Sequence, residues 1–136
     1  MYMDTLYVNG TSICIKLLGI AIFVLSAIGI AKIHSMYPKK HDRPSDFPRL
    51  LREGAYSIVR HPFYALTIVN QISVSIMLLS IEGIIASILC IPLWIILIVL
   101  EERELVEYWG KEYLDYRNEV PALIPLPWRR RKRKKS

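Results

Sequence analysis

Residues 13–33 form an almost unbroken apolar run, and this run constrains the fold more than any other feature of the chain. A helix needs about 20 apolar residues to cross the hydrocarbon core of a bilayer, which is about 30 Å thick. Two further apolar runs, 63–79 and 84–100, lie near the lower limit of that length. Residues 1–9 contain no Lys or Arg, so we expect the first run to be a retained span and not a cleaved signal peptide. The sequence therefore predicts an all-α integral membrane protein with three transmembrane helices.

The distribution of Lys and Arg predicts the orientation of these spans. The segment 34–61 and the chain after Leu100 are rich in Lys and Arg, whereas the link 80–83 contains neither. Basic segments stay on the cytoplasmic side of a membrane. We therefore expect the N-terminus outside, with the long loop and a C-terminal helical region in the cytoplasm. In a prokaryote the location would be the plasma membrane.

The length of the chain and the composition of its C-terminus limit the domain organisation and the partners that we expect. A chain of 136 residues is within the size of one domain, so residues 1–136 are predicted to form a single domain. The run 129–135 contains only Arg and Lys, and we expect it to lie in solvent near anionic lipid headgroups. A nucleic-acid partner is not expected. The cysteines have no metal-ligand spacing, and no metal is predicted.

Two clusters of ionisable and aromatic residues are expected to meet where the second and third spans reach the cytoplasm. Arg60, His61 and Tyr64 lie at the start of the second span, and Glu101 and Glu102 follow the third. The link between the spans is short, so their cytoplasmic ends should be neighbours. Taken singly, such residues could be anchors at the membrane boundary. Together they predict a site for a polar ligand.

Two stretches of the chain carry a family resemblance. Residues 54–64 fit the pattern G-x-Y-x-x-V-R-H-P-x-Y. Residues 101–121 fit E-E-x-x-L followed by an aromatic-Gly pair and Y-x-x-Y-x-x-x-V-P. Both resemble the isoprenylcysteine carboxyl methyltransferases and the related phospholipid N-methyltransferases. The resemblance extends over residues 48–125, which is more than half of the chain.

The resemblance implies methyltransferase activity with S-adenosyl-L-methionine as the cofactor. It implies a cytoplasmic cofactor-binding loop, in which residues 48–51 close over the cofactor. The residues that it implies for cofactor binding are Pro48, Arg49, Leu50, Leu51, Tyr56, Arg60, His61, Pro62, Phe63, Tyr64, Glu101 and Glu102.

The residue types suit that cofactor. Glu101 can accept hydrogen bonds from an ammonium or from ribose hydroxyls. Tyrosine faces can stabilise a sulfonium by cation–π attraction, and His61 or Arg60 can receive a carboxylate. Methyl transfer is a direct displacement, so alignment and desolvation should dominate over acid–base chemistry. No general base or other catalytic residue is assigned. Tyr113 and Tyr116 are expected to pack the C-terminal region and not to touch the ligand.

Two departures from the family pattern bear on the methyl acceptor. Leu66 stands where many members have Gly, and residues 95–100 lack the arginine that binds a carboxylate in the eukaryotic prenylcysteine enzymes. We therefore expect poor activity on free prenylcysteine carboxylates. A lipophilic small molecule or a lipidated substrate is expected, because the site opens at the membrane boundary. O-methylation of a prenylcysteine-like carboxylate and N-methylation of a lipid amine both stay open.

Two other functions fit parts of the sequence. An NADPH-dependent membrane reductase related to sterol reductases would share a Pro-x-Tyr motif and a Val-Pro ending. NADPH is rich in phosphate and favours Arg or Lys at its site, whereas Glu101, Glu102 and Glu104 suit a cationic cofactor. A non-catalytic membrane scaffold is the third possibility, and it leaves the Glu–His–Tyr cluster without a role.

Overall fold

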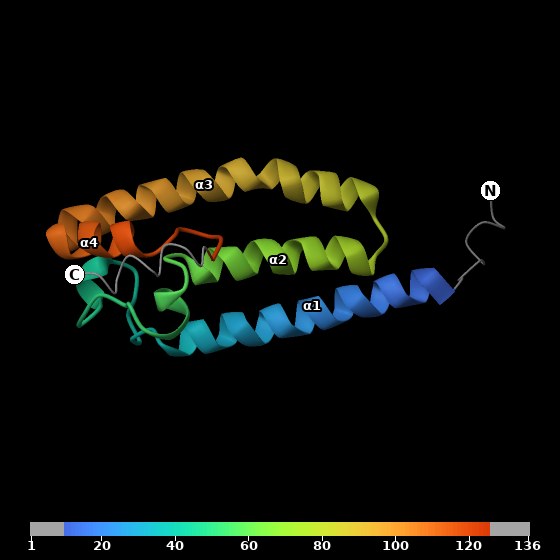
Figure 1. Cartoon of the computed structure of the whole chain (residues 1–136), viewed down its shortest axis with the longest axis horizontal. Coiled ribbons are helices and arrows are strands. Elements are labelled where there is room, and N and C mark those ends of the chain that lie inside the picture. The colour runs from blue at the N-terminus through green and yellow to red at the C-terminus, as the bar shows by residue number, and fades with distance from the viewer. Residues whose placement is uncertain (1–9, 126–136) are drawn as a thin grey trace. The chain divides into compact units, whose positions relative to one another are not determined.

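The computed structural model describes residues 10–125. The predictions for residues 1–9 and for the basic run 129–135 therefore lie outside the described residues. Within the described range the chain contains four α-helices and two short 3₁₀ helices, and no strand (Figure 1). The elements are α1 (Gly10–Ser35), a 3₁₀ helix (Pro44–Asp46), a second 3₁₀ helix (Gly54–Ser57), α2 (Pro62–Met77), α3 (Ile81–Trp109) and α4 (Lys111–Glu119). The predicted all-α fold class is confirmed.

Two of the helices, α1 and α3, are long and apolar enough to cross a membrane. They contain the predicted spans 13–33 and 84–100. The second predicted span, 63–79, corresponds to α2, which is apolar but has 16 residues. It ends at Met77 because the chain turns at the next residues, where Leu79 adopts a φ of 53°. The three-span topology and its orientation stay predictions.

The ends of the helices follow from residues that the chain places there. Pro62 is the first residue of α2, a position where its missing N–H is not needed. Gly110 separates α3 from α4 and has a φ of 58°, which a glycine adopts without steric cost. The α3 helix continues past its apolar part to Trp109, because the chain from Leu100 to Trp109 contains no Pro or Gly.

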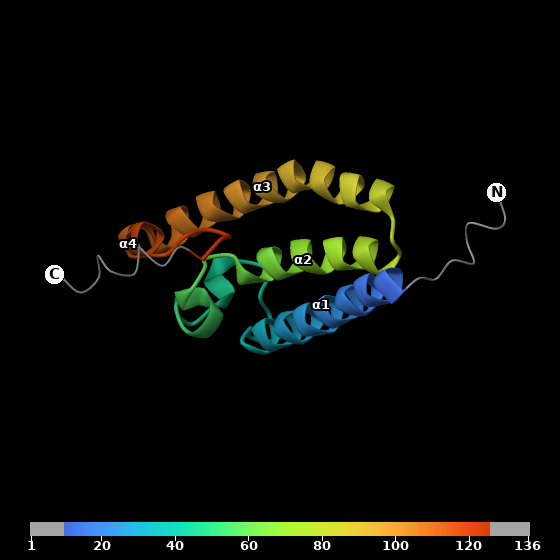
Figure 2. The same ribbon diagram turned by 45° about the vertical axis from the view of Figure 1, so that its right-hand side comes forward.

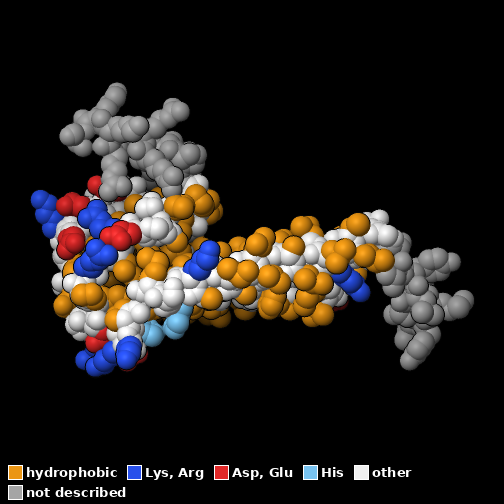
Figure 3. Space-filling model, turned by 90° about the horizontal axis from the view of Figure 1, so that it is seen from below, with side chains coloured by type: hydrophobic (Ala, Val, Ile, Leu, Met, Phe, Trp, Pro, Cys, Tyr) orange, Lys and Arg blue, Asp and Glu red, His pale blue; other side chains and the backbone are white. Residues whose placement is uncertain are grey.

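Contacts within the chain define two compact units, and the first comprises residues 10–30 and 66–91 of the described chain. Its parts of α1, α2 and α3 lie side by side (Figures 1 and 2). Asn70 of α2 donates from Nδ2 to the Ser26 hydroxyl of α1 at 2.9 Å, and Ser75 of α2 lies 3.4 Å from Ser87 of α3, oxygen to oxygen. Polar side chains at helix–helix contacts are typical of membrane bundles. Hydrophobic side chains cover much of the visible surface of these helices (Figure 3).

The second unit comprises residues 31–65 and 92–125 of the described chain. Its hydrophobic core consists of Tyr113, Tyr116 and Val120, and partly buried residues such as Leu105 and Trp109 pack against it. The backbone N–H of Arg60 donates to the Pro121 carbonyl at 2.8 Å, and that of His61 donates to the Ala122 carbonyl at 3.0 Å. The segment that follows α4 is thereby attached to the start of α2. The single-domain organisation of the chain stays a prediction.

Candidate functional site

A cavity of about 510 Å³ lies within the second unit. Its wall comes from the end of α1, the loop before α2, the start of α2, the C-terminal part of α3 and α4. The C-terminal part of α3 is the part predicted to lie in the cytoplasm. Nine of the twelve residues predicted from the sequence to bind a cofactor line it. They are Arg49, Leu50, Leu51, Tyr56, Arg60, His61, Phe63, Tyr64 and Glu101.

The other three predicted residues, Pro48, Pro62 and Glu102, do not line the cavity. Pro48 is exposed, and Pro62 is buried as the first residue of α2. Glu102 follows Glu101 on the same helix, and adjacent helical residues face different directions. One glutamate of the pair therefore reaches the cavity, while the other bonds to neighbouring protein groups.

Glu102 is the centre of a cluster that we call the Glu102 clamp, formed by Arg60, His61, Glu102 and Tyr113. The carboxylate oxygen Oε1 of Glu102 lies 2.7 Å from Nη2 and 2.9 Å from Nε of Arg60. The same oxygen accepts hydrogen bonds from Nε2 of His61 at 3.0 Å and from the Tyr113 hydroxyl at 3.2 Å. Glu102 lies beyond the apolar part of α3, which ends at Leu100. Burial raises its pKa, but hydrogen bonds from His61 and Arg60 outweigh burial and lower the pKa to about 2.

The Arg60 guanidinium also holds the end of α4. Its Nη1 donates to the carbonyl of Arg117 at 3.0 Å and to the carbonyl of Val120 at 2.7 Å. The side chain of Arg60 is only 9% exposed. Arg60 and His61, the two residues predicted from the sequence to bind a cofactor carboxylate, thus both bond to Glu102.

Tyrosine hydroxyls and Glu101 form one wall of the cavity. The hydroxyls of Tyr37 and Tyr56 lie 2.7 Å apart, and the Tyr64 hydroxyl hydrogen-bonds to Glu101. Burial raises the pKa of Tyr37 and that of Tyr56, and the negative charge of Glu101 raises both further. The hydroxyls therefore stay protonated beside a carboxylate. We call Tyr37, Tyr56, Tyr64 and Glu101 the tyrosine–glutamate wall.

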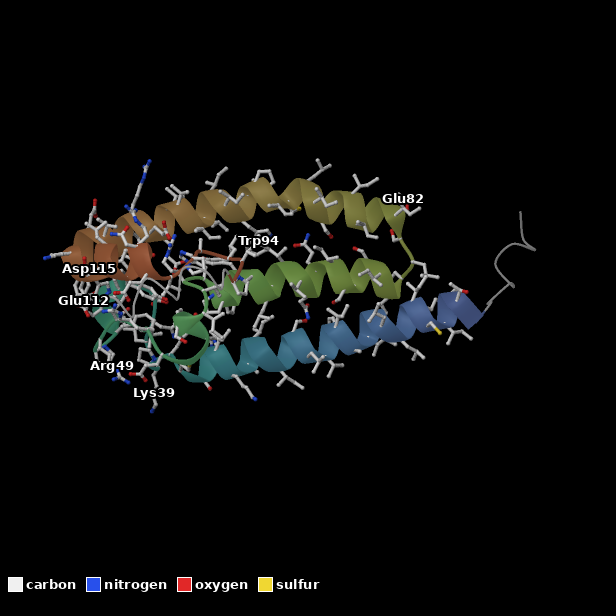
Figure 4. The ribbon with its side chains drawn as sticks, in the orientation of Figure 1. Lys39, Arg49, Glu82, Trp94, Glu112 and Asp115 are labelled. Atoms are coloured by element: carbon white, nitrogen blue, oxygen red, sulfur yellow. The ribbon has the colours of Figure 1, made fainter. Side chains whose placement is uncertain are left out.

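Aromatic contacts hold this wall in place. Tyr64 packs against Trp94 of α3 with ring centroids 5.8 Å apart, and Trp94 points toward the start of α2 (Figure 4). The Tyr116 hydroxyl donates to the Tyr56 carbonyl at 2.5 Å. Tyr113 and Tyr116 are buried in the core, as expected, and they also reach the cavity. The packing of Tyr113 and Tyr116 supports the tyrosine–glutamate wall on the side away from the cavity.

The end of α1 and the loop after it supply residues that the sequence did not predict for the site. His34, Tyr37, His41, Phe47 and Arg43 all line the cavity. The rings of His34, Tyr37 and His41 contact one another, with centroids 5.2 to 5.5 Å apart. A signal was present, since three aromatic or imidazole rings recur within eight residues directly after the first apolar run. Asp42 and Pro44 of the loop and Leu100, Glu104, Leu105 and Trp109 of α3 also line the cavity without having been predicted.

The arrangement suits a ligand with positive charge and a flat or apolar part. Glu101 and Glu104 bring carboxylates to the wall, and the tyrosine, phenylalanine and tryptophan rings offer faces for a cation. Two arginines of the wall are engaged with glutamates, since Arg49 lies 3.0 Å from Glu53 and Arg60 belongs to the Glu102 clamp. The described residues contain no group of His, Cys, Asp and Glu side chains that could hold a metal ion.

Comparison with known proteins finds sequence similarity to methyltransferases. The chain is 29% identical over 85 residues to protein-S-isoprenylcysteine O-methyltransferase B of Arabidopsis thaliana, an alignment that covers 62% of this chain and 43% of that protein. It is 30% identical over 108 residues to methanethiol S-methyltransferase 1 of Bradyrhizobium diazoefficiens, covering 79% of this chain and 36% of that protein. The chain thus spans less than half the length of these curated relatives. The sequence model of the phospholipid methyltransferase family matches residues 7–112, and the chain therefore belongs to the phospholipid methyltransferase family.

Proposed function

We propose that the protein catalyses S-adenosylmethionine-dependent methyl transfer to a lipophilic acceptor at the cytoplasmic face of a membrane. The proposal rests on family membership and on the cavity of the second unit. A volume of about 510 Å³ is within the range of small-molecule sites. The proposed topology has three spans, with the N-terminus outside and the C-terminus in the cytoplasm, because Lys and Arg collect on the loop and tail.

The single observation that carries the proposal is the tyrosine–glutamate wall. A cofactor with a sulfonium and an ammonium needs negative charge and aromatic faces, and this wall provides Glu101 beside Tyr37, Tyr56 and Tyr64. When bound, S-adenosylmethionine would supply an electrophilic methyl group. Glu101 would bind the ammonium or the ribose, while the tyrosine rings would face the positive charge and exclude water.

The Glu102 clamp has a positioning role in this proposal. It connects Arg60 and His61, which directly precede α2, to the part of α3 that carries Glu101. It also attaches residues 117–122 to the same point. The cofactor pocket is therefore held by buried charge and hydrogen bonds, and little reorganisation is needed when the ligand enters.

The acceptor is proposed to be lipophilic. The two relatives are named for isoprenylcysteine, which carries a large apolar group, and for methanethiol, which is small. Residues 95–100 of this chain carry no arginine for a carboxylate. We therefore propose that free prenylcysteine carboxylates are poorer acceptors than an acceptor without that charge.

The experiment is calorimetric titration of the detergent-purified protein with S-adenosylhomocysteine. Glu101→Gln keeps the size of the side chain and removes its charge. A charge-assisted hydrogen bond contributes about 1.5–3 kcal/mol, so the variant should bind about ten- to a hundredfold more weakly. Glu112→Gln is the matched control, because Glu112 is an exposed residue of α4 outside the cavity wall (Figure 4). It should bind like the wild type.

Titration with NADPH distinguishes the reductase alternative. Binding of NADPH without binding of S-adenosylhomocysteine would favour the reductase, and binding of neither would favour a scaffold. Equal affinity of wild type and Glu101→Gln for S-adenosylhomocysteine, in folded protein, would contradict the assignment of this wall.

A further inference from the structure

The pair His34 and His41 forms a second wall of the cavity beside Tyr37, and the cofactor assignment leaves both histidines without a role. The His34 and His41 rings meet edge to face, with centroids 5.2 Å apart and planes at 89°. Tyr37 contacts both rings, at 5.5 Å and 5.3 Å. All three line the same cavity as Glu101 and Tyr64. An imidazole in contact with a methyl-transfer site can accept a proton.

The backbone fixes which nitrogen of His41 is available. Nδ1 of His41 lies 3.0 Å from the carbonyl oxygen of Pro38. A carbonyl oxygen only accepts hydrogen bonds, so Nδ1 carries the hydrogen and donates it. In the neutral ring, Nε2 then holds the lone pair and is the basic atom. His41 is half-buried on the cavity wall, while His34 at the end of α1 is exposed to solvent.

The third histidine is held differently. Nε2 of His61 lies 3.0 Å from the Glu102 carboxylate, which only accepts hydrogen bonds, so that nitrogen carries a hydrogen. His61 is 4% exposed and belongs to the Glu102 clamp. Of the three imidazoles in the cavity wall, His41 therefore combines a fixed donor bond on one nitrogen with a half-buried position beside the cavity.

We infer that Nε2 of His41 is the proton acceptor of this site and that the methyl acceptor is a lipophilic thiol, protonated at neutral pH. The inference rests on the proposed function and deepens it. The sulfur–hydrogen bond breaks with its electron pair left on sulfur, and the proton bonds to Nε2. The thiolate then accepts the methyl group, which leaves its sulfonium carrier neutral. A carboxylate acceptor has no proton to lose and would not need His41.

Acid–base matching favours a thiol over an amine. An imidazole ordinarily changes charge between pH 5 and 8, a thiol near pH 8.5, and an alkylammonium near pH 10.4. Proton transfer to an imidazole is therefore less uphill from a thiol. The charged groups that share the cavity with His41 are Asp42, Arg43, Arg49, Arg60, Glu101 and Glu104. Arg49 and Arg60 are paired with Glu53 and Glu102, so the three carboxylates outnumber the one other arginine of the cavity wall.

The first test compares a thiol that must lose a proton before transfer with a thiol that is already ionised. 1-Octanethiol is protonated at pH 7, whereas 4-nitrothiophenol is already ionised. In His41→Ala, kcat with 1-octanethiol should fall about 10²- to 10⁴-fold at pH 7, because general-base catalysis contributes that much. The rate with 4-nitrothiophenol should change less than threefold. Added imidazole should restore part of the activity of His41→Ala with 1-octanethiol. A higher pH should reduce the difference in kcat between this variant and the wild type.

Two controls separate a proton-transfer role from a structural one. Lys39→Gln changes an exposed residue of the same loop that does not line the cavity, and it should leave kcat unchanged (Figure 4). His34→Gln tests the neighbouring ring and should reduce kcat much less than His41→Ala. The affinity of His41→Ala for S-adenosylhomocysteine should stay within threefold of the wild type. If no variant, including the wild type, binds that ligand, it is the proposed function that fails.

A measurement without turnover checks the same atom. In protein labelled with ¹⁵N histidine, the Nε2 signal of His41 should be that of a nitrogen without a hydrogen before the thiol is added. Addition of 1-octanethiol to the complex with S-adenosylhomocysteine should convert it to a protonated nitrogen. The inference is overturned if His41→Ala loses the same factor in kcat with both thiols. It is also overturned if methyl transfer to octylamine or octanoate is faster than to 1-octanethiol, or if Nε2 of His41 carries a hydrogen before the thiol is added.

Discussion

Replacement of Glu102 by Gln should destabilise the protein by about 3 kcal/mol, because it removes the charge at the centre of the Glu102 clamp. Arg60 approaches Glu102 with two nitrogens, at 2.7 Å and 2.9 Å, and its side chain is 9% exposed. Removal of one partner from a buried ion pair costs about 3–5 kcal/mol, because the other charge stays buried without compensation. Gln keeps one acceptor oxygen, and Arg60 keeps two carbonyl partners, so the lower end of that range applies.

The assay is reversible unfolding in mixed micelles, with near-ultraviolet circular dichroism as the probe. Glu107→Gln is the matched control, because Glu107 is exposed on the same helix and lies outside the clamp. Its free energy of unfolding should lie within about 0.5 kcal/mol of the wild type. The same stability for Glu102→Gln and Glu107→Gln would refute the buried-charge argument.

The pH dependence of the free energy of unfolding gives an independent check that the Glu102 carboxylate stabilises the fold. The pKa of Glu102 is lowered in the folded state to about 2, from an ordinary value of 4.5. A lowered pKa means that the ionised carboxylate stabilises the fold above about pH 4.5, and that this contribution is lost as the pH falls toward 2. The difference in stability between wild type and Glu102→Gln should therefore be constant near neutral pH and shrink between pH 4.5 and 2.

Two further predictions concern the tyrosine–glutamate wall and the membrane topology. Tyr37→Phe removes the hydroxyl that lies 2.7 Å from that of Tyr56, and calorimetry should show about three- to tenfold weaker binding of S-adenosylhomocysteine, as expected for loss of one neutral hydrogen bond. Unchanged affinity in the folded variant would remove Tyr37 from the site. A reporter that is active only outside the cytoplasm should be active when it is inserted after Ser80, in the link between α2 and α3. The same reporter fused after residue 125 should be inactive. A cytoplasmic signal at Ser80 would contradict the three-span topology.

The sequence predicted the parts of this molecule that depend on local pattern. Apolar runs predicted α1 and the apolar part of α3, because helix formation in lipid follows from apolar length. The approach of Glu101 to Tyr64 followed from a tight hairpin and a shared motif. Those inferences needed only periodicity, link length and residue type.

The remaining contacts depend on how a loop turns, and the sequence did not predict them. His34, Tyr37 and His41 meet because the chain after α1 folds back, with Nδ1 of His41 bonded to the Pro38 carbonyl. A proline-rich loop has no periodicity from which ring contacts can be inferred. The different roles of Glu101 and Glu102 also became visible only when the partners of each carboxylate were known, although adjacent helical positions cannot face the same way.

The backbone bonds from Arg60 and His61 to Pro121 and Ala122 have a consequence for biosynthesis. A nascent chain that has reached only residue 110 already contains α1, α2 and α3, but it lacks the carbonyls that hold the start of α2. Contacts this far apart in sequence form only after the later segment has been made. The apolar helices can therefore enter the bilayer first, and the cavity takes shape as a late step, when the chain after α4 emerges from the ribosome.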